Sequence, residues 1–340
     1  MTEVSAAREI ILLSQAYARA RVLHSAVDVG LFELLAAGPR EVAGICAALG
    51  LHPALVPDWL DALVGLDLLV RTERGYGNSA AATAFLVPGS PAYLGGAVAQ
   101  HGAVHYPLWQ RLTEALRDGH AKSDRSTLAG AVQDEQRDLE RARRFLSHMD
   151  TFNGFVADDL VRALDWRNYT KVLDVGGARG NIAAALVAEH PHLRAAVFDL
   201  PGVRPLFDEH MRRLGTADQV DFHGGDFFHD PLPPTEVAIL GHVLHDWPVE
   251  SRRRILEGIA AAVQPGGALL IYDAMLETDA ADPHGHVQSL ICSMIRDGGS
   301  EYSGEDCRIW VEQAGFRVDR VIPLQTITRD RLLIAHRLDV

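Results

Sequence analysis

Residues 171–180 read KVLDVGGARG, a short apolar run that ends in closely spaced glycines. The run has the length of a buried strand, and NIAAALVAEH (181–190) follows it with the composition of a buried helix. Glycines between a strand and a helix let the backbone approach a bound ligand closely. This segment therefore predicts the first strand–turn–helix unit of an α/β sheet, with a ligand site at the glycine turn.

After this unit, apolar runs alternate with helical stretches such as SRRRILEGIAAAV (251–263). The further predicted strands are RAAVFDL (194–200), QVDFHGGD (219–226), VAILGHVL (237–244) and GALLIYDA (267–274). Such alternation is typical of a parallel sheet with helices on both faces. The last two strand candidates, FRVDRVIPL (316–324) and DRLLIAHRL (330–338), are expected to form a hairpin at the sheet edge.

The first half of the chain is predicted to be mostly helical. Residues 7–35 are apolar on more than one face, which indicates a helix buried on several sides, either in its own domain or against a second subunit. Residues 39–80 indicate a winged helix, with one helix ended by Gly50, a second opened by Pro53, and a hairpin wing in LLVRTERGYGNS (68–79).

Two helical segments, 108–119 and 139–166, are expected to bridge to the second half, after turns at 88–103 that contain Pro and Gly. The second helix of the winged-helix segment carries three Asp residues and neither Lys nor Arg, so DNA is a poor candidate ligand.

Charge and composition limit the partners further. The formal net charge is −13, and an acidic chain repels the phosphate backbone of nucleic acids. The three cysteines lack metal or disulfide spacing, which favours a reducing, cytoplasmic setting. The N-terminus does not have the pattern of a signal peptide, and the apolar runs are too short or interrupted to span a bilayer. The expectation is a soluble protein with neither nucleic acid nor membrane as partner.

Polar residues follow the predicted strands where each strand ends. Asp199 ends the second strand, where an acidic side chain would accept hydrogen bonds from a ribose. Up to this point a dinucleotide site and an S-adenosylmethionine site look alike. After the third strand, Asp226 can accept a hydrogen bond from an adenine amino group while Phe227 packs on the ring. The fourth strand leads into HVLHDW (242–247), whose first histidine we expect to be structural.

Taken together, these segments resemble the small-molecule O-methyltransferase family of plant phenolic and bacterial natural-product enzymes. The resemblance covers nearly the whole chain. It rests on LDVGGARG (173–180), VFDLPGV (197–203), GGDFF (224–228), HVLHDW (242–247), PGGALLIYDA (265–274) and GGSEYS (298–303).

The resemblance implies a Rossmann-like, doubly wound α/β methyltransferase sheet with an N-terminal, mostly helical winged-helix dimerisation domain. It also implies S-adenosyl-L-methionine as cofactor, S-adenosyl-L-homocysteine as product, and a homodimer formed through the N-terminal helices. We expect a dimerisation domain at 1–105, linking helices that line the substrate pocket at 106–164, and the catalytic domain at 165–340.

Site roles follow from the resemblance residue by residue. His245 is the implied general base, because a phenol with a pKa of about 10 is a poor nucleophile until it loses its proton. Asp273 and Glu301 stand where the family has two glutamates that orient the imidazole. The implied cofactor contacts are Gly176, Gly177, Asp199, Leu200, Asp226, Phe227, Gly241, Asp246 and Trp247. The implied acceptor contacts are Met149, Asn153, His101 and His105.

Two positions depart from the family. Gly241 stands where plant members usually have a lysine, and Arg179 is a bulky residue inside the glycine turn. Contacts to the cofactor must therefore differ at these two positions.

O-methylation of a hydroxylated aromatic compound in secondary metabolism is the leading interpretation. One alternative is C-methylation of a 2-oxo acid or phenol, with His245 and Asp246 holding a metal ion. That site lacks a clear third ligand, since His284 and His286 fall in an expected loop and Asp297 is a weaker donor. Further alternatives are a non-catalytic winged-helix regulator that senses a ligand, and a redox protein with a dinucleotide.

Overall fold

The computed structural model describes residues 3–90, 92–123, 139–276 and 283–338. They form two compact units that divide between Pro107 and Leu108, and we describe each by itself. Within the described residues, each helix is too short or too polar to cross a membrane. The domain boundaries at residues 105 and 164 stay predictions.

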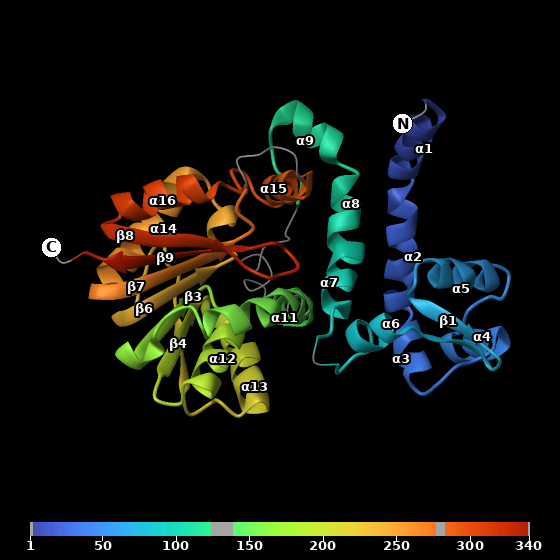
Figure 1. Ribbon diagram of the computed structural model, residues 1–340, viewed down its shortest axis with the longest axis horizontal. Coiled ribbons are helices and arrows are strands. Elements are labelled where there is room, and N and C mark those ends of the chain that lie inside the picture. The colour runs from blue at the N-terminus through green and yellow to red at the C-terminus, as the bar shows by residue number, and fades with distance from the viewer. Residues whose placement is uncertain (1–2, 91, 124–138, 277–282, 339–340) are drawn as a thin grey trace. The chain divides into compact units, whose positions relative to one another are not determined.

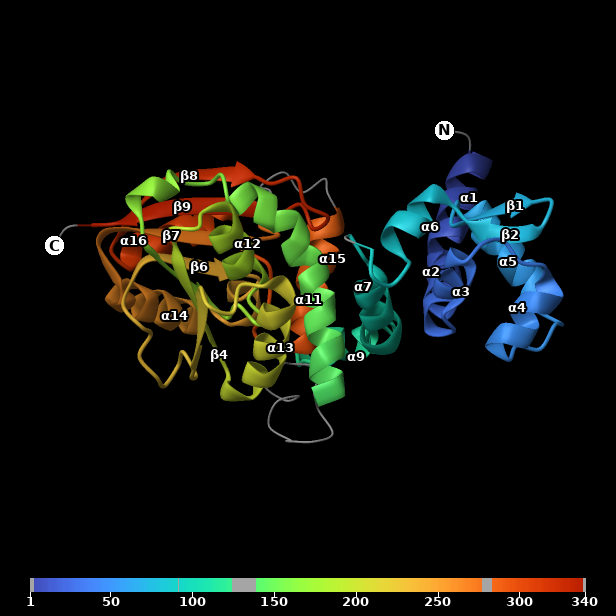
Figure 2. The same ribbon diagram turned by 90° about the horizontal axis from the view of Figure 1, so that it is seen from below.

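The first unit contains the predicted winged helix. The unit's elements are α1 (Glu3–Ser14), α2 (Ala16–Asp28), α3 (Leu31–Ala36), α4 (Val42–Leu49), α5 (Val56–Gly65), β1 (Leu69–Thr72), β2 (Gly75–Asn78), α6 (Ala80–Phe85), α7 (Gly95–Gln100) and a π-helical turn (His101–His105) that leads into α8 (Tyr106–Trp109). Helix α4 ends at Gly50, which adopts the left-handed conformation that glycine tolerates best. The antiparallel hairpin β1–β2 contacts α5 and forms the wing (Figure 2).

Two local predictions for this unit are wrong. Helix α5 begins at Val56 rather than at Pro53, and Pro57 occupies its first turn, where the missing N–H costs nothing. The expected turns at 88–103 end early, because α7 and the π-helical turn begin at Gly95. Tertiary packing outweighs the low helix propensity of glycine there, since a Cβ on Gly102 would lie 3.1 Å from the His24 side chain.

The apolar N-terminal helices remain largely uncovered within the single chain. The exposed apolar side chains here include Ile10, Ile11, Leu12, Leu13 and Tyr17, of which Leu13 is 77% exposed. Exposed apolar side chains that are close together in the sequence indicate an interaction site. Of the two alternatives for residues 7–35, burial against a second subunit therefore fits this exposure better.

The second unit is built on a seven-stranded sheet. The strands are β3 (Lys171–Val175), β4 (Arg194–Asp199), β5 (Val220–Gly224), β6 (Thr235–Gly241), β7 (Val263–Asp273), β8 (Phe316–Pro323) and β9 (Arg331–Arg337). Their order is β5-β4-β3-β6-β7-β9-β8. Strands β3 to β7 pair in parallel, whereas β9 pairs antiparallel with both β7 and β8. The doubly wound sheet and its edge hairpin are confirmed, with the last strand inserted between β7 and β8.

Helices cover both faces of this sheet. The helices of this unit are α9 (Leu112–Asp118), α11 (Leu139–Leu160), α12 (Asn181–Glu189), α13 (Arg204–Leu214), α14 (Val249–Ala262), α15 (Pro283–Ile295) and α16 (Gly304–Gln313). Figure 1 shows α12 and α13 on one face and α14 and α16 on the other, each pair packed on its own apolar cluster. The carboxyl ends of β3 to β7 meet at one edge of the sheet, which is where α/β folds bind ligands.

Candidate active site

Two positions in the turn after β3 have room for glycine only. Gly176 has φ 75°, and a Cβ there would lie 2.8 Å from Val243. A Cβ on Gly177 would lie 2.5 Å from the Asp174 carboxylate. Ala178 has φ 51°, which is strained for a residue with a side chain. At Gly176 and Gly177 the backbone therefore carries no side chain, as a ligand that binds at close range requires.

Asp199 connects the end of β4 to this turn. Its Oδ2 accepts a hydrogen bond from the N–H of Ala178 at 2.9 Å, and its Oδ1 accepts one from the N–H of Leu200 at 2.7 Å. Burial raises the pKa of Asp199 to about 6, although these two hydrogen bonds act against the shift. A carboxylate has about four acceptor sites, so Asp199 can accept two more hydrogen bonds, for example from a pair of hydroxyl groups.

Aromatic side chains gather at the ends of β5 and β6. The ring of Phe227 lies 4.8 Å from that of Phe228 and 6.0 Å from that of Trp247, and the Arg296 guanidinium lies 3.9 Å from the Trp247 ring. Asp226 uses its Oδ1 to accept the Phe228 N–H at 2.9 Å, which fixes the turn that presents Phe227. The segment after β5 therefore presents the apolar ring of Phe227 next to the Asp226 carboxylate.

Gly241 is explained by the neighbouring strand. A Cβ at this position would lie 1.8 Å from the Tyr272 ring, so the ring fills the space that a lysine side chain would need. The Tyr272 hydroxyl donates to Oδ1 of Asn153 on α11 at 3.2 Å. Asn153 is buried, and Met149 lies half-buried one turn earlier on the same helix. The structure thus places Met149 and Asn153, two of the four predicted acceptor contacts, on α11, and their role stays a prediction.

Arg179, the other departure, is turned toward α11. Its buried guanidinium forms an ion pair with Asp150, which also accepts a hydrogen bond from the Asn181 amide. Burial, together with the neighbouring arginines Arg213 and Arg143, lowers the pKa of Arg179 to about 10. The bulky side chain therefore fixes the glycine turn to α11.

His245 lies in a short 3₁₀ turn, Leu244–Asp246, directly after β6. Its Nδ1 is 2.9 Å from Oε1 of Glu301, which precedes α16, and 3.3 Å from Oδ1 of Asp273, the last residue of β7. Both carboxylates are fully buried. Since Nδ1 faces two acceptors it carries the proton, so Nε2 is the basic nitrogen of the neutral ring.

The surroundings of His245 favour its cation. Burial opposes the charged ring, but Cys292, Asp273 and Glu301 together raise the pKa of His245 well above its ordinary value. Burial raises the pKa of the Cys292 thiol to about 12, so near neutral pH the two carboxylates supply the negative charge. Burial likewise raises the pKa of Asp273 to about 6 against the effect of His245. The arrangement stabilises an imidazolium once the ring has taken a proton.

Metal-binding potential is concentrated at the same histidine. In the described part of the chain, two groups have suitably spaced donor atoms: His242 with His245 and Asp273, and His245 with Cys292 and Glu301. Asp246 belongs to neither group, although its Oδ1 lies 3.8 Å from Nε2 of His245.

The other metal candidates from the sequence lie apart from these groups. His284 and His286 lie in the first turn of α15, so the expected loop is wrong there. Asp297 lies 3.7 Å from His120 and accepts the Ala121 N–H.

His101 and His105 lie in the first unit, on the π-helical turn, with ring centroids 5.0 Å apart. Burial lowers the pKa of His105 to about 4, so this ring is neutral near pH 7. Their assignment as acceptor contacts stays a prediction.

Three residues near the base were missed in the sequence. The Tyr302 hydroxyl donates to Oδ2 of Asp273, and Cys292 lies beside Glu301. Arg252 on α14 donates to the carbonyl oxygens of Trp247 and Ser300, and so fixes the turns that carry His245 and Glu301. Tyr302 follows Glu301 in GGSEYS and was detectable there, whereas Cys292 and Arg252 carry no local signal.

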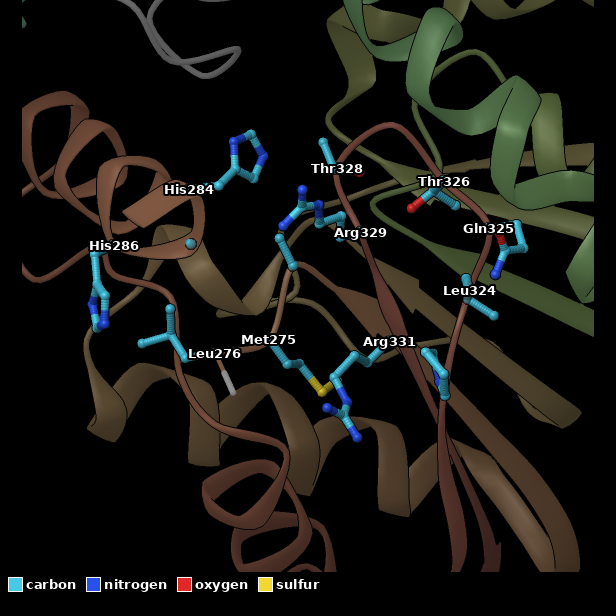
Figure 3. A pocket seen from close by; sticks show the side chains of 13 residues that line it. Met275, Leu276, His284, His286, Leu324, Gln325, Thr326, Thr328, Arg329 and Arg331 are labelled. Carbon is cyan, nitrogen blue, oxygen red and sulfur yellow. The ribbon is translucent and has the colours of Figure 1, made fainter. Parts of the chain in front are cut away.

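A cavity of about 340 Å³ lies beside the end of β7. Figure 3 shows its lining, which comes from the residues after Asp273, the first turn of α15 and the loop between β8 and β9. Met275, Leu276, Leu324 and Arg331 are among the lining residues. The cavity therefore lies next to the end of β7, the strand that carries Asp273.

Comparison with protein families gives two matches. Residues 109–317 match the O-methyltransferase domain, and residues 11–88 match the O-methyltransferase dimerisation domain.

Two relatives from Streptomyces are each 44% identical to this chain. The N,N-dimethyltransferase OxyT of Streptomyces rimosus aligns over 98% of both chains. The tetracenomycin polyketide synthesis 8-O-methyl transferase TcmO of Streptomyces glaucescens aligns over 93% of both.

Solved structures show the same architecture. Human N-acetylserotonin methyltransferase in complex with S-adenosylmethionine superposes with a TM-score of 0.86 at 26% identity and covers all of both chains. The mitomycin 7-O-methyltransferase MmcR superposes with a TM-score of 0.84 at 26% identity over 98% of each chain.

Proposed function

This chain belongs to the O-methyltransferase family and uses S-adenosylmethionine, and from that premise we propose that it methylates a hydroxyl group of an aromatic natural product with His245 as general base. Membership of an enzyme family favours catalysis over the winged-helix regulator. The observation that carries the proposal is the imidazole of His245, whose Nδ1 lies within 3.3 Å of two buried carboxylates at the ligand-binding edge of the sheet.

The residues at this edge fit the cofactor. S-adenosylmethionine, when bound, supplies a methyl group on a positively charged sulfur. The bare turn at Gly176 and Gly177 admits a close ligand, and Asp199 keeps acceptor sites for the two ribose hydroxyls. Phe227 and Asp226 together offer an apolar face and an acceptor suited to adenine.

His245 would take the proton of the acceptor hydroxyl. A phenol has a pKa of about 10, so near neutral pH a base must remove its proton as the new bond forms. Nε2 of the neutral ring accepts that proton, and Glu301 and Asp273 then stabilise the imidazolium through Nδ1. The two carboxylates thus contribute most after the proton has moved, which is how they lower the barrier.

The acceptor is testable by direct screening. Purified protein with S-adenosylmethionine is offered polycyclic phenols, simple catechols and 2-oxo acids, and products are read by mass and by methyl position. O-methyl products from polycyclic phenols are expected. Methylation at carbon only, abolished by a chelator, would instead establish the metal-assisted alternative.

N-methylation is a second candidate. It is favoured by the 44% identity to OxyT, a named N,N-dimethyltransferase, which equals the identity to TcmO. The same screen decides it with matched pairs of acceptors that differ only by a hydroxyl or an amino group at one position. Dimethylated amine products, with the phenol partner unchanged, would replace O-methylation by N-methylation.

We also propose that the chain forms a homodimer through its first unit. Residues 11–88 match the dimerisation domain of the family, and the apolar side chains of α1 are exposed in the single chain. Mass measurement in solution at micromolar concentration is expected to give twice the chain mass of 37.1 kDa. A monomer at that concentration would refute the proposal.

A further inference from the structure

His242 has a backbone conformation that disfavours its side chain. It follows β6 and has φ 52°, while its N–H donates to the carbonyl oxygen of Tyr272 at 3.0 Å. A left-handed residue with a Cβ costs about 1–2 kcal/mol, and glycine would avoid this cost. Backbone strain of this kind clusters at functional sites, so the contacts of this side chain decide whether it has a role.

The ring of His242 lies between two buried carboxylates. Its Nδ1 is 3.8 Å from Oδ1 of Asp273, and its Nε2 is 3.7 Å from Oδ2 of Asp330. Both aspartates have no exposed surface. Asp330 is fixed at the end of the β8–β9 loop, where its carboxylate accepts from the Thr328 hydroxyl at 2.6 Å and its N–H donates to the Thr326 hydroxyl. Figure 3 shows this loop beside the cavity next to β7.

The charges around the two histidines show where His242 can act. Three buried carboxylates, those of Asp273, Glu301 and Asp330, surround the two histidines. A buried carboxylate without a compensating charge is costly. His245 and the buried Arg252 guanidinium act on Asp273 and Glu301, whereas Asp330 has His242 within ion-pair distance. Among the described residues, Oδ1 of Asp273, Nε2 of His242 and Oδ1 of Asp330 have no hydrogen-bond partner. His242 lies within ion-pair distance of Oδ1 of Asp273, and of Oδ2 rather than Oδ1 of Asp330.

We propose that His242 is a positioning residue: ion-paired with Asp330, it holds the Asp273 carboxylate directed at Nδ1 of His245. The inference rests on the proposed role of His245 as base. Asp273 accepts the Tyr302 hydroxyl on Oδ2, so its Oδ1 is the atom that both imidazoles share. His242 therefore acts on the base through Asp273.

The ring of His242 is faced by groups from four places in the fold. The titratable ones are Asp273 and Tyr272 on β7, His245 in the turn after β6 and Asp330 before β9, and α11 contributes the Phe152 ring. Loss of a positive charge at His242 leaves the carboxylate of Asp273 less compensated. His245 would then bind its proton more tightly, and the acidic limb of the kcat–pH profile would move to higher pH.

The test is His242→Asn, because asparagine tolerates positive φ better than most residues and cannot carry charge. We expect kcat to fall roughly tenfold, the scale of coupling between contacting residues, with KM for S-adenosylmethionine unchanged and the acidic limb moved to higher pH. In an Asp273→Asn background the same change should alter kcat by less than about twofold. The inference would be overturned if the losses in kcat from His242→Asn and Asp273→Asn were additive, or if the acidic limb of the kcat–pH profile did not move.

Two further variants make the outcome decisive. Asp330→Asn keeps the acceptor for Thr328 and removes the anchoring charge, so it should lower kcat and be non-additive with His242→Asn. If His242→Asn fails to fold, full activity of Asp330→Asn refutes the inference by itself. His190→Asn is the matched control, since this half-buried imidazole at the end of α12 bonds the carbonyl oxygen of Val161, away from the glycine turn and His245, and it should lower only thermal stability. Full turnover in His245→Ala would refute the base assignment instead.

Discussion

Replacement of Glu301 by glutamine tests two effects of this carboxylate on His245, namely on the pKa of the ring and on the maximal rate. The change keeps the size of the side chain and removes its charge at 2.9 Å from Nδ1. An opposite charge this close raises a histidine pKa by about 1–3 units, so the pKa of His245 should fall by about that amount. Because the neutral ring is the active form, the acidic limb of the kcat–pH profile should move to lower pH.

The maximal rate should fall at the same time. Asp273 remains 3.3 Å from Nδ1, so the expected loss in kcat is about 10–10²-fold, less than the ~10²–10⁴-fold loss that removal of a general base gives. The assay is methyl transfer at saturating substrates from pH 5.5 to 10, with affinity for S-adenosylhomocysteine measured by calorimetry. Glu305→Gln, at an exposed glutamate in the first turn of α16, is the control and should match the unmodified enzyme. If the acidic limb of the kcat–pH profile of Glu301→Gln stays in place or moves to higher pH, the proposed effect of Glu301 on the pKa of His245 is refuted.

Further outcomes test the cofactor site, the packing, the dimer and the metal alternative. Asp199→Asn should weaken binding of S-adenosylmethionine by about 10–100-fold in calorimetry, because it removes a charged acceptor, while the melting temperature stays close to normal. Gly241→Lys should lower unfolding stability by about 1–3 kcal/mol or more in urea titration, since its Cβ would overlap the Tyr272 ring. Leu13→Asp should shift the protein from dimer toward monomer in sedimentation if α1 lies in the interface. Treatment with a chelator should leave turnover unchanged.

The sheet could be predicted from the sequence because its signals are local. Each strand from KVLDVGG (171–177) onward is a short apolar run bounded by glycine or a polar residue, and its length, rather than its periodicity, distinguishes it from the helical stretches between the runs. Helix starts were harder. Pro53 and Pro57 are both plausible first-turn residues, and only the packing of Val56 and Leu60 in the core selects the second. The position of β9 beside β7 could not be predicted, because the spacing of strands along the sequence does not determine which strands pair.

The site could be predicted where its residues sit in motifs at strand ends. His245, Asp273 and Glu301 were each nominated from a separate segment, and the structure brings them within hydrogen-bonding or ion-pair distance. Asp330 and Cys292 were not nominated, because their relation to the base depends on how a hairpin and a helix pack against the sheet edge. Residues that contact the base from distant segments, without a local sequence pattern, can be identified only from the structure.

The most direct test of the central claim compares His245→Ala with the unmodified enzyme on a phenolic acceptor. With the base removed, kcat should fall by about 10²–10⁴-fold while affinity for S-adenosylmethionine, measured by calorimetry, stays within about twofold. Turnover of the variant should recover in part as the pH approaches about 10, because the phenolate then forms without a base. Unimpaired turnover in His245→Ala at pH 7.5 would contradict the claim that this histidine takes the acceptor proton.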